Sequence, residues 1–100
     1  MEIFITKKNA VNPDNVAFIK GESNYTTLFF SDGSKKMVVA QTLHLVHEKL
    51  SDSRTFIRLS KSVVLNVINI ETFNKRSVKL KNGESLVPSR RRARSFFEEL

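Results

Sequence analysis

The chain has 100 residues, 40% of them hydrophobic and 27% charged, which is typical of one globular domain and not of a disordered segment. It carries 17 Lys and Arg side chains against 10 Asp and Glu, a formal net charge of +7, and it contains no Cys. This composition excludes disulfide bonds, cysteine-ligated zinc and thiol catalysis. No apolar run approaches the roughly 18 residues of a membrane-spanning helix, and no secretion signal is evident, so we expect a single cytoplasmic domain over residues 1–100.

The excess of positive charge lies entirely in the second half of the sequence. Residues 1–53 carry six basic and six acidic side chains, whereas residues 54–94 carry eleven basic and two acidic ones. Because such a local surplus repels itself, it is expected where a polyanion docks. A basic surface that only keeps the domain soluble is the alternative interpretation.

Alternation of apolar and polar side chains predicts that strands dominate the middle of the chain. The predicted strands are residues 3–6, 16–20, 25–30, 36–39 and 63–70. The even-numbered side chains of the third strand share one face, and the connection that precedes it, residues 21–24, is short. The last strand is apolar except for Asn66 and Asn69, so we expect it to be buried on both faces.

A short helix is predicted in the middle of the chain. Thr42 can cap it, and Leu43, Val46 and Leu50 follow at spacings of three and four residues.

Downstream, the pair Asn82-Gly83 predicts a hairpin with a two-residue turn. Val78 and Leu80 alternate with Lys79 and Lys81 before this turn, which places the apolar side chains inward and the lysines outward.

A second helix is predicted at the C-terminus, with Ser89 as its N-cap. Its apolar stripe is Ala93, Phe96, Phe97 and Leu100. Its charges oppose the helix dipole, which favours acidic side chains at the start and basic ones at the end. The helix instead opens on four arginines and closes on two glutamates, namely Arg90, Arg91, Arg92, Arg94, Glu98 and Glu99. Free backbone N–H groups and guanidinium groups together suit a phosphate, with a solvated basic face as the alternative.

His44 and His47 are the two histidines of the chain and lie three residues apart on the predicted mid-chain helix. A zinc site needs three or four ligands, and Glu48 is the only acid beside them, so we predict an exposed helix face and no metal. No spacing selects a catalytic triad or a Gly-rich phosphate loop, so we expect neither enzyme activity nor a cofactor.

Two other segments present polar side chains where strands meet. The loop tip Asn24-Tyr25 offers an amide that can pair with adenine and a phenol that can bond a phosphate, although a plain surface loop would look the same. In the second segment, Ser60 lies between Arg58 and Lys61 at a junction of two strands, where such side chains can contact successive phosphates. A single extended ligand explains the presence of these two segments and the arginine-rich helix better than three unrelated causes do.

The order and spacing of several short blocks resemble the LytTR DNA-binding domain of bacterial transcription regulators over about residues 14 to 100. The blocks are Phe18-Ile19, Ser23-Asn24-Tyr25, Thr42-Leu43, Phe56-Ile57-Arg58, Ser60-Lys61-Ser62, Val64-Leu65-Asn66, Ile70, Asn82-Gly83 and Val87-Pro88-Ser89-Arg90-Arg91. The resemblance implies a mainly β fold of small stacked antiparallel sheets, with one short helix mid-chain and one at the C-terminus.

The resemblance also implies a way of binding DNA. Family members bind promoter DNA through loops that enter successive major grooves, and on that pattern the loop around Asn24-Tyr25, the Ser60-Lys61 junction and Arg90 are the contacting positions. Many members have His where this chain has Ser60, so the bases read there are not implied. Members also usually carry an N-terminal receiver or membrane sensor domain, so the chain is expected to be either a stand-alone module or a fragment. Pairing on repeated half-sites is implied as well.

We therefore predict a domain that binds double-stranded promoter DNA in a sequence-specific manner. Arg90 is expected to read a guanine, and Asn24 or Tyr25 to contact a base edge or the backbone. The expected phosphate anchors are Arg58, Lys61, Arg91 and Arg92, with Ser60 beside them. The alternatives are a β-module that binds RNA or single strands, and a protein-interaction module that sequesters a regulator through its basic face. The leading prediction requires that Asn24, Lys61 and Arg90 lie along one side of the folded domain.

Overall fold

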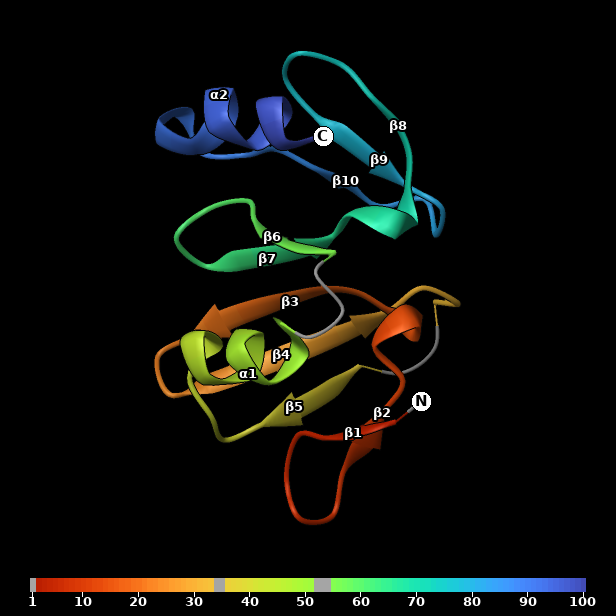
Figure 1. Cartoon of the computed structure of the whole chain (residues 1–100), viewed down its shortest axis with the longest axis vertical. Coiled ribbons are helices and arrows are strands. Elements are labelled where there is room, and N and C mark those ends of the chain that lie inside the picture. Colours follow the sequence, from red (N-terminus) through yellow and green to blue (C-terminus); the bar gives the residue numbers. More distant parts are fainter. Residues whose placement is uncertain (1, 34–35, 52–54) are drawn as a thin grey trace.

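The computed structural model describes residues 2–33, 36–51 and 55–100, which form small antiparallel sheets stacked along the long axis of the molecule, with two α-helices (Figure 1). The body measures 39 × 25 × 22 Å. The predicted mainly β fold, with one short helix mid-chain and one at the C-terminus, is confirmed. No helix within the described ranges is long and apolar enough to cross a membrane.

A five-stranded antiparallel sheet forms the middle of the molecule, in the strand order β5-β4-β3-β7-β6. Its strands are β3 (Val16–Glu22), β4 (Tyr25–Phe30), β5 (Met37–Val39), β6 (Phe56–Arg58) and β7 (Val63–Asn66). The central strand β3 pairs with both β4 and β7, so the sheet joins residues that lie far apart in the sequence.

One face of this sheet packs against α1 (Leu43–Leu50) and the N-terminal segment. The buried side chains of this first core are Ile5, Val11, Val16, Ile19, Leu28, Val39, Leu43, Val46, Leu50, Phe56 and Val64. The predicted helix is confirmed, because Thr42 Oγ1 accepts a hydrogen bond from the Leu45 N–H at 3.3 Å and the three predicted apolar positions are buried. The even-numbered side chains of β4 also share this face, as predicted.

The opposite face is covered by a three-stranded sheet and α2 (Arg90–Glu99). The strands of this second sheet are β8 (Ile70–Phe73), β9 (Val78–Leu80) and β10 (Ser85–Leu86). The second core consists of Ala17, Phe18, Leu59, Leu65, Val78, Leu80 and Phe96. An irregular register between Val16 and Phe18 turns two successive side chains of β3 toward this core. A small hairpin of β1 (Ile3–Phe4) and β2 (Ala10–Val11) lies at the end of the molecule opposite α2 (Figure 1).

The prediction of one strand over residues 63–70 is wrong. The strand β7 ends at Asn66, a 3₁₀ turn follows at Val67–Asn69, and β8 starts in the other sheet. The buried Asn66 amide causes the break, since its Nδ2 donates to the Val16 and Pro13 carbonyls at 2.9 and 3.2 Å. Its Oδ1 also accepts from the Ile68 N–H at 3.4 Å. Two asparagines in an apolar run therefore mark the point where the chain passes from one sheet to the next.

The C-terminal part differs from its prediction in two details. The hairpin at Asn82-Gly83 is present with Val78 and Leu80 buried, but its connection spans residues 81–84 and only Gly83 in it has a positive φ, +94°. The helix α2 begins after Ser89 as predicted, and Phe96 is buried, but Leu100 at the end of the stripe is 41% exposed.

Candidate nucleic-acid interface

Three polar segments lie along the same long side of the molecule. They are the β3–β4 turn, the β6–β7 loop and the start of α2, all on the left in Figure 1. Two backbone hydrogen bonds tie them together: the Gly21 N–H donates to the Ser62 carbonyl at 2.7 Å, and the Ser89 N–H donates to the Leu59 carbonyl at 3.2 Å. The structure thus brings together the three segments that contain Asn24, Lys61 and Arg90.

The β3–β4 turn consists of only Ser23 and Asn24, shorter than the predicted connection. Ser23 adopts a positive φ of 54°, which lets the strands reverse direction in two residues. Asn24 and Tyr25 are exposed at its tip, with 56% of the tyrosine accessible. Both side chains are therefore free to meet a ligand on this side.

Gly21 positions this turn and was not singled out by the sequence. A Cβ atom at Gly21 would lie 2.7 Å from the Leu43 Cβ, closer than real side chains approach. The absence of a side chain lets β3 run against the first turn of α1 while its backbone bonds Ser62. The sequence did contain one sign of this close approach, because a glycine stands in the predicted connection 21–24.

Leu59 anchors the β6–β7 loop, because its side chain is buried in the second core. The N–H groups of Leu59 and Ser60 both donate to the Val63 carbonyl, at 2.9 and 3.2 Å. The Ser60 hydroxyl is half-buried and accepts from the Ser62 N–H at 3.3 Å. Lys61, by contrast, is exposed at the tip of the loop.

Arg58 lies at the end of β6 and also shapes this loop. Its Nη1 donates to the Lys61 carbonyl at 2.8 Å. Partial burial first, and then the positive charge of Arg92, lower the pKa of the Arg58 guanidinium. The side chain therefore has a structural contact that the sequence did not predict, and it lies within electrostatic reach of α2.

The start of α2 carries the exposed side chains of Arg90, Arg91 and Arg92. Ser89 stands at the N-cap position, but its hydroxyl makes no capping hydrogen bond to the helix. Further along the helix, Arg94 Nε and Glu98 Oε1 form an ion pair at 3.2 Å. The helix therefore begins with three arginines and without a side-chain cap.

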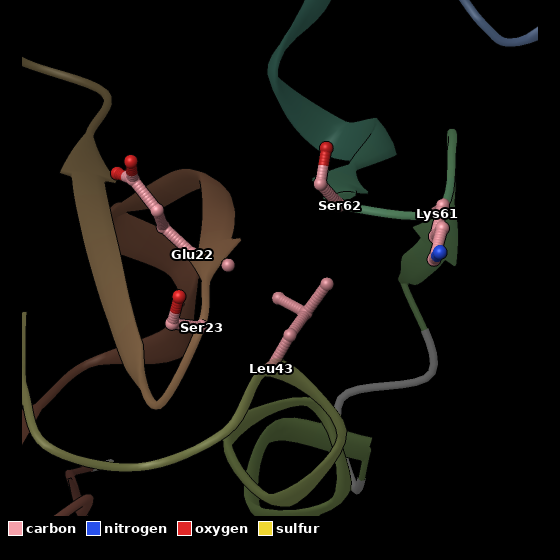
Figure 2. Close-up of a pocket in the computed structure, with 6 residues that line it drawn as sticks. Glu22, Ser23, Leu43, Lys61 and Ser62 are labelled. Atoms are coloured by element: carbon pink, nitrogen blue, oxygen red, sulfur yellow. The ribbon is translucent and has the colours of Figure 1, made fainter.

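A shallow cleft of about 260 Å³ separates the β3–β4 turn from the β6–β7 loop. Figure 2 shows the Leu43 side chain pointing up from α1 between the two segments, with Glu22 and Ser23 on one side and Lys61 and Ser62 on the other. Among the described residues that line this cleft, Glu22 is the acidic one. Its charge opposes a phosphate there, which leaves Lys61 and the arginines as the attractive groups.

The two histidines lie on α1 and do not line this cleft. His47 Nε2 is 3.3 Å from the Phe56 carbonyl, and burial lowers the pKa of its imidazole. His44 is exposed beside Glu48 at 3.6 Å. In the part of the chain that the structure describes, no three His, Asp or Glu side chains are grouped so that they could hold a metal ion.

Comparison with known proteins gives the family of this domain. Residues 7–100 match the model of the LytTr DNA-binding domain. The chain belongs to this family, which is non-catalytic and acts in transcription regulation by binding DNA. The expectation that the chain is not an enzyme is therefore confirmed.

A solved structure supports the fold. The chain is similar to a LytTr DNA-binding domain from Bacillus cereus, taken from a protein assigned as a methyl-accepting/DNA response regulator. The TM-score is 0.71 at 19% sequence identity, over 99% of this chain and 93% of that one. At this identity the similarity shows a common fold. No curated protein matched the sequence.

Proposed function

We propose that the chain binds double-stranded promoter DNA in a sequence-specific manner, as the output domain of a bacterial transcription regulator. The observation that carries this proposal is the alignment of the β3–β4 turn, the β6–β7 loop and the start of α2 along one side, tied by backbone hydrogen bonds (Figure 1). Separate protruding segments suit loops that enter successive major grooves. The longest dimension, 39 Å, is close to one helical turn of B-DNA, about 34 Å.

The proposed contacts divide into base readers and phosphate anchors. Arg90 reads a guanine through its O6 and N7 atoms, and Asn24 or Tyr25 contacts a base edge or the backbone. The phosphate anchors are Arg58, Lys61, Arg91 and Arg92, with the Ser60 hydroxyl as a further polar group. The proposed readers and anchors together occupy all three interface segments, which supports these roles. Phosphate contacts fix the register in which base readers act.

The distribution of aromatic side chains favours duplex DNA over a single strand. Modules that bind single strands stack bases on exposed aromatic rings. Here Phe18 lies in the second core, and the half-buried Phe29 stacks on it with ring centroids 4.3 Å apart. Of the three interface segments, only the β3–β4 turn has an aromatic residue beside it, Tyr25 at the start of β4. A single ring offers no platform for successive bases.

The proposal also includes two protein partners that the family pattern suggests, a second copy of the domain and a receiver or sensor domain. The domain acts as one unit over residues 1–100 in the cytoplasm and pairs with a second copy on repeated half-sites. In a longer regulator, a receiver or sensor domain would control it. The Bacillus cereus relative, assigned as a response regulator, supports this arrangement.

The test is selection of binding sites from a random duplex library, followed by titration of the selected and a scrambled duplex at stated salt. Arg90→Ala is expected to reduce the preference for the selected duplex by about 1–3 kcal/mol. The matched control is Arg94→Ala, one turn further along α2, where the arginine pairs with Glu98. Equal losses on both duplexes for Arg90→Ala would refute its reading role. Failure of selection, or tighter binding of the matched single strand, would refute the proposal itself.

A further inference from the structure

The end of β6 and the start of α2 are fixed against each other. The Ser89 N–H donates to the Leu59 carbonyl at 3.2 Å, and the Arg92 N–H in turn donates to the Ser89 carbonyl at 3.0 Å. Arg58 directly precedes Leu59 in the chain, and Arg92 lies one helical turn after Ser89. These bonds therefore place the backbones of Arg58 and Arg92 on either side of one junction.

The Arg58 side chain is held in place at this junction. Its Nη1 donates to the Lys61 carbonyl at 2.8 Å, which engages one of the five donors of the guanidinium group. Because the group is planar, this single bond also fixes the direction of the remaining donors. Arg58 is half-buried, whereas Arg92 is exposed.

Among the described residues, neither of these two cations forms an ion pair with an acidic side chain. The positive charge of Arg92 acts on Arg58 and contributes, after burial, to the lowered pKa of its guanidinium. The ion pairs formed among the described residues are His44–Glu48 and Arg94–Glu98, and neither includes Arg58 or Arg92. Two basic side chains at one junction, with no ion pair to an acid among the described residues, are expected where an anion binds.

We propose that Arg58 and Arg92 form one composite site that binds a single phosphate of the DNA backbone, while Arg58 also holds the β6–β7 loop in shape. This inference rests on the proposed function and deepens it. The two non-bridging oxygens of one phosphate accept from two guanidinium groups, which removes the repulsion between them. The site thereby links the β6–β7 loop and α2 through the ligand, and it sets the register in which Lys61 and Arg90 meet the duplex.

The experiment combines substitutions with a scan of the DNA backbone. The selected duplex is made as a series, each member carrying one uncharged methylphosphonate, and each is titrated with the wild-type protein, Arg58→Gln, Arg92→Gln and the double variant. We expect one phosphate position whose neutralisation weakens wild-type binding roughly tenfold, weakens each single variant less, and leaves the double variant unchanged. The matched control is Arg91→Gln, which changes an exposed neighbour on α2. We expect this variant to lose its response to neutralisation at a different phosphate position.

A second measurement separates the loop-shaping role of Arg58 from its phosphate contact. In the free protein, amide chemical shifts of residues 60–63 are expected to change in Arg58→Gln and Arg58→Lys, but not in Arg92→Gln. Arg58→Lys keeps the positive charge but lacks the guanidinium group. It therefore separates loss of the bond to the Lys61 carbonyl from loss of the charge.

The outcomes that would overturn the inference are distinct from those that would refute the function. If Arg58→Gln and Arg92→Gln map to different phosphates, or if neither alters the scan, the composite site is wrong while duplex binding stands. If no duplex is selected from the library, the proposed function fails instead.

Discussion

Asn66 shows how one buried polar side chain determines the course of the chain. Its amide is fully buried and donates to two carbonyls of the segment around Pro13 and Val16, about fifty residues earlier in the sequence. Asn69 adds a third bond to the same region, Nδ2 to the Val16 carbonyl at 3.3 Å. These contacts divide an apolar run between two sheets. The identity of the partner carbonyls could not be predicted, because they depend on the tertiary fold and not on local periodicity.

Asn66→Ala is expected to lower the free energy of unfolding by about 3 kcal/mol. The substitution removes three hydrogen bonds of a fully buried amide, those to the Pro13 and Val16 carbonyls and the one from the Ile68 N–H, and each such bond contributes about 0.5–1.5 kcal/mol. Urea unfolding followed by circular dichroism measures the change. The matched control is Asn74→Ala, because Asn74 accepts from the Arg76 and Ser77 N–H groups in an exposed turn, where water can replace it. Equal losses for the two variants would contradict the role assigned to burial.

The environment of His47 leads us to expect that the free energy of unfolding depends on pH. Burial, followed by the nearby charges of Arg58 and His44, lowers its pKa in the folded state, and only the bond to the Phe56 carbonyl opposes this. As the pH falls below the ordinary histidine value of about 6.5, the unfolded chain takes up the proton more readily than the folded one. Stability is therefore expected to fall as the pH decreases from about 7 toward 5, and to level off once the folded state is protonated too.

The variant His47→Gln tests this origin, because it removes the titrating group. Unfolding midpoints measured across the same pH range are expected to lose their histidine-dependent slope in this variant and to keep it in His44→Gln. His44 is the natural control, since it lies on the same helix but is exposed. A slope that persists unchanged in His47→Gln would assign the dependence to another group.

At the scale of elements, the charges of helix α2 oppose the stability of the helix. Its first turn carries three arginines at the positive end of the helix dipole, and the Ser89 hydroxyl provides no cap. Each exposed cation there costs about 0.3–1 kcal/mol of helix stability. Such an arrangement is expected where function outweighs local stability.

Arg91→Glu is therefore expected to stabilise the free domain by about 0.5 kcal/mol while weakening DNA binding. Thermal unfolding at low salt measures the first effect, because salt screens the dipole interaction, and duplex titration measures the second. Arg91→Gln, which removes the charge without reversing it, is expected to give a smaller change of the same sign in both measurements. A destabilised Arg91→Glu protein would show that the arginine supports the helix through contacts of its own.

The same scale shows which elements local patterns can predict. The helix after Thr42, the Asn82-Gly83 hairpin and the reversed charges of α2 follow from spacings within a few residues, and all three are present. The close approach of Gly21 to Leu43 could not be predicted, because it depends on where α1 docks. The bond from Arg58 to the Lys61 carbonyl likewise depends on the shape of a loop that the sequence marks only as polar.

At the scale of the whole molecule, the interface results from long-range pairing. The charge surplus of residues 54–94 indicates a polyanion from sequence alone. That the β3–β4 turn, from the neutral half of the chain, joins the arginines on one side follows from the pairing of β3 with β7. Composition therefore predicts the class of ligand, whereas the sheet order determines which segments lie together on the proposed interface.

This arrangement predicts how binding depends on salt. If about six phosphates are neutralised, the logarithm of the affinity should fall against the logarithm of the salt concentration with a slope near −5. Lys61→Gln removes one exposed cation from the β6–β7 loop and is expected to reduce the slope by about one. The control is Lys8→Gln, which removes the same charge from the turn between β1 and β2, at the end of the molecule opposite α2 (Figure 1). Because a distant charge releases no counter-ion at the contact, this variant should keep the wild-type slope. An equal reduction in both variants would mean that the duplex responds to net charge and not to the three segments, and the interface would have to be placed elsewhere.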